Sequence, residues 1–238
     1  MKNNDSRTKY LENLIKNQLG PDDTFAFKCN ACGCCCRNRE DVLLSPHDLY
    51  RISKHLSIKP QEAFERYCET YIGQTSNIPV VRLKPKPVPN LLLRNPLPYS
   101  SVCPLLSDGR CSVHKSKPVT CALFPLGRMY NPQTKKVSYV LNNGKCGDKS
   151  EKQTVKDWLA EFSIPVYDKV FILWNEFLTE TVMKMKKLKK MPDKAKELFY
   201  SCFFFAVYLA YDINEEFLPQ LEKNIAKFQK LMDTMPSN

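Results

Sequence analysis

The sequence predicts an α+β fold that is mostly α: a loop-rich cysteine-cluster region with short strands and a β-hairpin, packed with a C-terminal helical bundle. Two observations predict this class. The 17 prolines of the 238-residue chain concentrate in its first two thirds, where they oppose long helices. From about residue 150, apolar residues repeat at helical spacing instead. We therefore expect a cysteine-cluster domain over residues 1–150 and an α-helical region over residues 151–238, as two domains or as one continuous domain.

Helix-start and helix-stop residues predict the elements before residue 72. Ser45 is a good N-cap, and Pro46 fits the first turn of the helix that follows it. Pro60 marks another helix start, and Gly20-Pro21 ends an earlier helix. The segment that carries the clustered cysteines should be a loop, because its backbone has to fold around a ligand. We expect helices at residues 8–20, 46–56 and 60–71, and a loop at residues 25–40.

Prolines and residues that favour β-strands determine the structure predicted for the middle of the chain. Residues 78–83 predict a short strand, and the prolines between residues 85 and 98 allow only edge strands or extended loop after it. Residues 126–142 have the pattern of a β-hairpin, with its turn at residues 131–134.

The C-terminal third carries the helical pattern. Residues 193–212 are apolar nearly all round, which is typical of a central helix. The other stretches show an apolar stripe at helical spacing. We expect helices at residues 152–162, 165–190, 193–212 and 215–233.

The apolar runs and the N-terminus suggest a compartment. The first residues are polar and charged, without the apolar core of a secretory signal. The longest apolar run, residues 198–211, spans about 14 residues, whereas a membrane helix needs roughly 20. We expect a soluble, cytoplasmic protein without a membrane partner. In that compartment, clustered cysteines are more often metal ligands than disulfides.

The cysteine spacing predicts the kind of metal. Cys29-x-x-Cys32-x-x-Cys35 is the tripod spacing of bacterial [4Fe–4S] sites, and Cys103-Pro104 resembles the remote cysteine that completes them. Further cysteines follow in turn-rich segments, where a loop could present them. We predict as metal ligands the thiols of Cys29, Cys32, Cys35, Cys36, Cys103, Cys111, Cys121 and Cys146.

Zinc is the alternative to iron–sulfur. Structural zinc is commonly held by two CxxC pairs, and the sequence contains only the first of them. The neighbours Cys35 and Cys36 would serve two irons of one cluster, or two separate sites. Three cysteines are expected not to bind metal, namely Cys34, Cys68 and Cys202.

Several ordered blocks carry a resemblance to a known family. They are Phe27-x-Cys29-x-x-Cys32-Gly33-x-Cys35-Cys36, Cys103-Pro104-Leu105-Leu106, Gly109-Arg110-Cys111, Lys117-Pro118-x-x-Cys121 and Phe124-Pro125. Over residues 25–150 the chain resembles the YkgJ-type CxxCxxCC cysteine-cluster family, which implies a zinc- or iron-chelating domain. The same pattern is similar to that of flagellin lysine N-methylases, for which an iron–sulfur cluster and methyl transfer are implied. The chain departs from the family pattern at Cys34, His114 and Lys117.

These observations lead to three functional hypotheses. The first is a cytoplasmic protein with an iron–sulfur centre, a redox or cluster-dependent role, and an unidentified protein or redox partner. The second is a structural zinc protein with an interaction role, and the third is a relative of the lysine N-methylases. No dinucleotide or P-loop motif is present, and no residue stands out as catalytic. The net charge of +11 includes a lysine run at residues 184–190, but that run fits a solvated helix end better than a nucleic-acid site.

Overall fold

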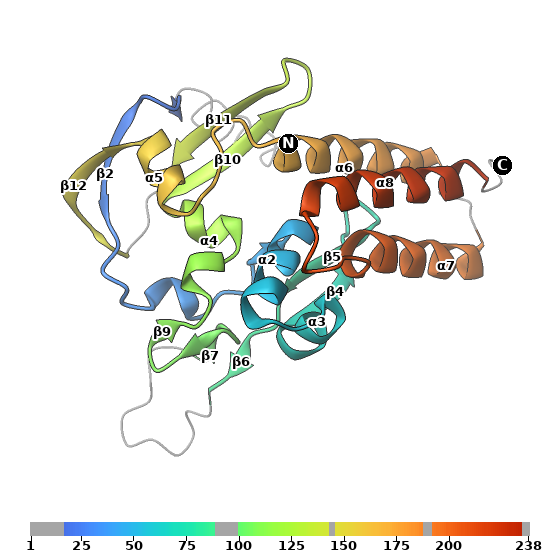
Figure 1. Ribbon diagram of the computed structural model, residues 1–238, viewed down its shortest axis with the longest axis horizontal. Helices are drawn as coiled ribbons and strands as arrows, with labels where there is room; N and C mark the ends of the chain where they lie inside the picture. Colours follow the sequence, from blue (N-terminus) through green and yellow to red (C-terminus); the bar gives the residue numbers. More distant parts are fainter. Residues whose placement is uncertain (1–16, 89–99, 143–145, 188–191, 235–238) are drawn as a thin grey trace, which may run out of the picture. The chain divides into compact units, whose positions relative to one another are not determined.

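The computed structural model describes residues 17–88, 100–142, 146–187 and 192–234 (Figure 1). By its internal contacts the chain divides into two compact units, each drawn from two separate stretches. The first unit comprises Met1–Cys32 with Val119–Ile172, and the second comprises Gly33–Pro118 with Leu173–Asn238. Compactness does not show which segments fold independently. The domain boundary expected near residue 150 therefore stays a prediction.

The first unit is built from antiparallel strands and short helices. One sheet has the strand order β1-β11-β10, and a separate two-stranded ladder pairs β2 with β12 (Figure 1). Its elements are β1 (Gln18–Leu19), β2 (Thr24–Lys28), α4 (Val119–Leu123), β10 (Leu126–Asn131), β11 (Lys136–Leu141), β12 (Asp148–Thr154), α5 (Val155–Glu161) and the first turn of α6 (Lys169–Lys187).

Aromatic rings fill the core of the first unit. Trp158 on α5 packs edge-on against Phe25 and Phe27 of β2, with ring centroids 6.2 and 5.6 Å apart. Its indole N–H donates to the carbonyl of Leu123 at the end of α4, at 3.1 Å. The core thus fastens β2, α4 and α5 together, which fixes the segments that carry this unit's cysteines.

The second unit combines a small sheet with helices. The sheet has the order β3-β5-β4, and Figure 1 shows α7 and α8 running alongside each other. Its elements are η1 (Cys34–Cys36), β3 (Leu43–Leu44), α2 (Pro46–Leu56), α3 (Pro60–Tyr67), β4 (Cys68–Ile72), β5 (Pro79–Leu83), β6 (Lys86–Pro87), β7 (Ser101–Val102), β8 (Leu106–Ser107), β9 (Arg110–Cys111), η2 (His114–Ser116), the rest of α6, α7 (Asp193–Phe204), the π-helical η3 (Phe205–Leu209) and α8 (Phe217–Asp233).

The long helices of the second unit meet through phenylalanines. Phe177 of α6 stacks on Phe203 of α7 at 6.0 Å and meets Phe228 of α8 edge-on at 5.9 Å. Phe203 and Phe228 are themselves in contact, and both are buried. This packing confirms the predicted helical bundle and, with the small sheets, the α+β class. Among the described residues, no helix has the length and apolar character needed to cross a membrane.

Several predicted elements are confirmed. Helix α2 begins at Pro46 with a full capping box: Ser45 accepts from the Asp48 amide, and the Asp48 carboxylate accepts from the Ser45 amide at 2.8 Å. Strand β5 and the hairpin of β10 and β11 lie where they were predicted. Helices α6, α7 and α8 occupy the last three of the four predicted C-terminal stretches. In the stretch at 193–212, the α-helix ends at Phe204 and continues as η3.

Other expectations are wrong. The predicted loop at 25–40 contains strand β2, whose buried Phe25 and Phe27 alternate with outward residues. The helix expected at 60–71 ends at Tyr67, because Cys68–Ile72 pairs with β5 instead. The helix expected from residue 152 starts at Val155, since the preceding residues pair with β2. Residues 8–16 of the first predicted helix lie outside the described residues, and Gln18–Leu19 forms β1 rather than helix.

Candidate metal centre

The eight predicted ligands divide evenly between the two units. All eleven cysteines lie in the described residues, and none forms a disulfide. The first unit holds Cys29, Cys32, Cys121 and Cys146, and the second holds Cys35, Cys36, Cys103 and Cys111.

In the first unit, the β2–β12 ladder brings distant cysteines together. Lys28 at the end of β2 is the register partner of Asp148 at the start of β12. The residues just beyond this pair, including Cys29 and Cys146, therefore leave the ladder at the same end. The Sγ atoms of Cys32 and Cys146 lie 3.6 Å apart. The predicted tripod thus gains a partner 114 residues away in the sequence.

A glycine makes this approach possible. Gly147 adopts φ +78°, in the left-handed region that residues with a Cβ atom rarely occupy. A Cβ atom placed on it would lie 2.3 Å from Cε2 of Phe27 and 2.6 Å from the carbonyl oxygen of Lys28. Only glycine therefore lets the chain pass so close to β2. Neither this role nor strand β12 was predicted from the sequence.

The other two thiols of the first unit are placed by its core. Cys29 is exposed in the loop directly after β2. Cys121 is half-buried on α4. The two residues that follow it, Ala122 and Leu123, lie in the same core as the phenylalanines of β2. Hydrogen bonds from Ser150 and then Asn30 lower the pKa of the Asp148 carboxyl beside this loop.

In the second unit, backbone hydrogen bonds hold η1 against the segment after β7. The Cys103 amide donates to the Cys36 carbonyl at 2.7 Å, and the Asn38 amide donates to the Ser101 carbonyl at 3.0 Å. The side chains of Cys36 and Cys103 also meet, since the thiol of Cys36 hydrogen-bonds with Cys103. The Sγ atom of Cys36 lies 4.0 Å from that of Cys35.

The short β8–β9 hairpin adds a fourth thiol to this group. The Leu106 amide donates to the Cys103 carbonyl at 3.0 Å, and Leu106 is the register partner of Cys111. Cys111 lies within electrostatic range of Cys35 and Cys36. We call Cys35, Cys36, Cys103 and Cys111 the second-unit group.

Two thiols of this group, those of Cys36 and Cys111, have raised pKa values and hold their protons in the metal-free chain. The hydrogen bond with Cys103, followed by burial, raises the pKa of Cys36 to about 11. Burial raises the pKa of Cys111, against the opposing effects of the Val113 amide and Lys117. A metal would have to displace these protons, because cysteine binds metals as a thiolate.

The cysteine thiols are donors that suit a soft metal, but they are not arranged around a single point as the ligands of one ion would be. Among residues 17–88, 100–142, 146–187 and 192–234, no three Cys, His, Asp or Glu side chains are close enough to hold one ion. Thiols gathered in short contacts without disulfides are nevertheless the donors that zinc and iron–sulfur clusters select. The assignment of all eight cysteines as ligands stays a prediction.

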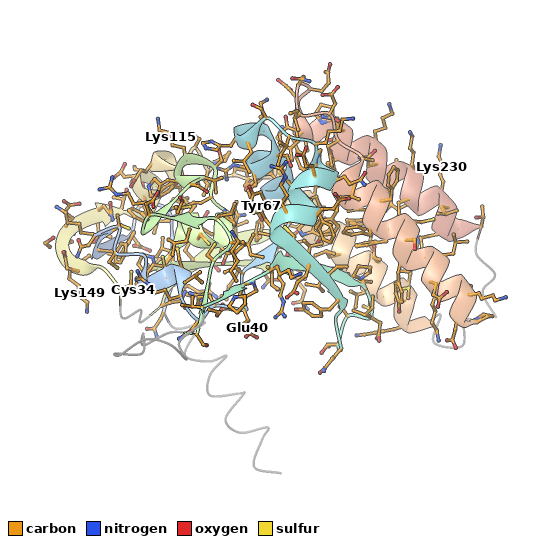
Figure 2. The ribbon with its side chains drawn as sticks, turned by 90° about the horizontal axis from the view of Figure 1, so that it is seen from below. Cys34, Glu40, Tyr67, Lys115, Lys149 and Lys230 are labelled. Atoms are coloured by element: carbon orange, nitrogen blue, oxygen red, sulfur yellow. The ribbon has the colours of Figure 1, made fainter. Side chains whose placement is uncertain are left out.

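The three cysteines expected not to bind metal have different surroundings. Cys34 is exposed on η1, where Figure 2 labels it. Cys202 is half-buried on α7. Cys68 is buried as the first residue of β4, with 6% of its surface exposed, and burial raises its pKa to about 12.

The burial of Cys68 leads to a testable prediction. With iodoacetamide at neutral pH, the native metal-free protein should be alkylated at the exposed Cys29 and remain unmodified at Cys68, because alkylation needs an accessible thiolate. Peptide mass mapping measures both sites in one sample. The same treatment in denaturant is the control, in which both thiols should react. Rapid native labelling of Cys68 would contradict its place in the core.

Comparison with known proteins identifies one family. The family model described as "CxxCxxCC: Putative zinc- or iron-chelating domain" matches residues 28–154, a span that includes all eight predicted ligands. No curated protein and no solved structure matches the chain.

Proposed function

Because the chain belongs to the CxxCxxCC family of zinc- or iron-chelating domains, we propose that it is a cytoplasmic protein that holds an iron–sulfur centre through its clustered cysteines. The proposed centre is of the [4Fe–4S] type, with a redox or cluster-dependent role and a protein redox partner. Such a group supplies one-electron chemistry or a Lewis-acidic iron when bound. The chain's own residues supply thiolates, burial and orientation.

The observation that carries this proposal is the second-unit group. It joins the adjacent Cys35 and Cys36 to Cys103 through a backbone hydrogen bond and a thiol contact, and Cys103 precedes a proline. Adjacent residues bind one metal ion only with strain, whereas a polynuclear cluster offers them separate irons. Half-burial of all four thiols favours a cluster shielded from oxygen.

Zinc is the second candidate, since the family description includes both metals. A zinc centre would fold the loops around η1 and leave the helices to bind a partner. Methyl transfer of the lysine N-methylase kind stays a prediction of the sequence resemblance. We propose no nucleic-acid partner: Lys184 of the basic run pairs with Asp233 at 2.8 Å, and Lys230 lies exposed on α8 (Figure 2).

Metal analysis of anaerobically purified protein tests the proposal. We expect iron with acid-labile sulfide and a brown colour, whereas colourless protein with zinc alone would favour the second candidate. The double variant Cys29→Ala with Cys103→Ala should lose its iron. Cys202→Ala on α7 is the matched control and should keep the wild-type content. Equal metal content in both variants would refute the ligand assignment.

A further inference from the structure

Two thiols of the first unit are in contact although they are far apart in the sequence. Cys32 and Cys146 are separated by 114 residues, and their Sγ atoms are 3.6 Å apart. The register of β2 with β12 brings both chain segments to the same end of the ladder. A left-handed residue adjoins each thiol, since Ala31 before Cys32 has φ +49° and Gly147 after Cys146 has φ +78°. The ladder and these two bends together show that the fold specifies the contact.

This contact needs little movement to become a disulfide. The Sγ separation of 3.6 Å has to shorten to about 2.0 Å, which rotation of the two side chains can largely supply. Neither Cys32 nor Cys146 belongs to a helix or strand. Closure of the bond therefore does not require any strand pairing to break.

The other close thiols are less suited to a disulfide. Cys35 and Cys36 lie 4.0 Å apart at Sγ, but neighbouring Cα atoms are about 3.8 Å apart, whereas disulfides usually need roughly 4.4 Å or more. Cys36 and Cys103 are in contact, but both are half-buried. In the first unit, by contrast, Cys32 is exposed and Cys146 is half-buried beside it. An accessible thiol next to a resolving thiol is the arrangement of redox-sensing cysteines.

We propose that Cys32 and Cys146 form a reversible disulfide when the protein meets a low-molecular-weight disulfide such as oxidised glutathione. The thiolate of Cys32 attacks the glutathione disulfide, bonds to one glutathione sulfur and expels the other as a thiolate. The thiolate of Cys146 then attacks the Cys32 sulfur and expels the second glutathione. Two protein thiols are oxidised, one glutathione disulfide is reduced to two molecules of glutathione, and the two protein protons pass to them.

The disulfide has two consequences for the first unit. It links the loop after β2 to the segment before β12 by a covalent bond. It also removes two of the eight predicted ligands from metal binding, so oxidation and metal binding compete for these thiols. The inference goes beyond the proposed function and does not depend on which metal the chain binds. Metal analysis tests that function, whereas disulfide mapping tests this inference.

Disulfide mapping of the full-length protein as purified tests the pairing. The protein is treated with excess oxidised glutathione and blocked with iodoacetamide before proteolysis and mass spectrometry. We expect the cross-linked peptides to join mainly Cys32 to Cys146. In denaturant this product should become minor, because loop closure favours Cys29 with Cys32 on the order of 100-fold. A native product dominated by the Cys29–Cys32 disulfide, or no cross-link at Cys32, would overturn the proposal.

Single substitutions test the order of the two steps. Cys146→Ser lacks the resolving thiol, so it should lose the cross-link and retain glutathione on Cys32 as a mixed disulfide. Cys202→Ser on α7 is the matched control and should give the wild-type cross-link. Peptide mass mapping detects both products. Cys32 without attached glutathione in Cys146→Ser would contradict its role as the attacking thiol.

Discussion

Replacing Asp168 by alanine is expected to lower the free energy of unfolding by about 3–5 kcal/mol, because it would leave a buried guanidinium without its counter-charge. Arg128 on β10 donates to the Asp168 carboxylate at 2.7 Å, and the two side chains are only 5% and 9% exposed. The guanidinium also lies over the ring of Phe171, 3.6 Å from its centroid.

Asp168 has a second role at the start of α6. Its carboxylate accepts from the Phe171 amide at 3.0 Å, and its carbonyl accepts from the Ile172 amide at the same distance. The substitution therefore removes a helix cap as well as the ion pair, and an N-cap contributes about 1 kcal/mol. The substitution should therefore weaken the attachment of the β10–β11 hairpin to α6, which contacts of Arg128 and Tyr130 with Phe171 also hold.

Urea unfolding followed by circular dichroism measures the effect. Glu151→Ala is the matched control, since Glu151 pairs with Lys28 in the same unit at exposed positions, and such pairs contribute about 0–1 kcal/mol. The double variant Arg128→Met with Asp168→Leu should recover much of the stability lost in Asp168→Ala, because it removes the orphaned charge. A loss in Asp168→Ala no larger than that in Glu151→Ala would contradict the buried pair.

The elements that were predicted correctly from the sequence are stabilised by interactions between residues close to one another in the chain. Ser45 and Asp48 define the start of α2, because a capping box acts within one helical turn. The hairpin at residues 126–141 follows from its turn and its β-formers. The C-terminal helices follow from apolar periodicity.

Long-range pairing explains what was missed. Strand β12 has the sequence DKSEKQT, which is polar and largely exposed, so no alternation marks it. It is a strand only because β2 pairs with it. The same applies to the site: residue types and spacing identified eight cysteines, but not that Cys146 meets Cys32 or that Cys103 meets Cys36. Those contacts arise from β2–β12 and from the bonding of η1 to the segment after β7, neither of which is visible in a spacing pattern.

The dependence of the first-unit cysteines on backbone geometry makes Gly147→Ala the sharpest test of that unit. The left-handed conformation alone costs a residue with a Cβ atom about 1–2 kcal/mol. Overpacking against Phe27 and the Lys28 carbonyl adds about 1–3 kcal/mol, because one of the contacts is backbone and cannot rotate away. We expect a loss of about 2–5 kcal/mol in unfolding free energy.

Gly109→Ala separates these two costs. Gly109 adopts φ +75°, nearly the same as Gly147, but an added Cβ would have no heavy atom within 4 Å. The control should therefore show the conformational cost of about 1–2 kcal/mol alone. Chemical denaturation of both variants gives the comparison. If Gly147→Ala were as stable as Gly109→Ala, close passage of residue 147 along β2 would not be what positions Cys146.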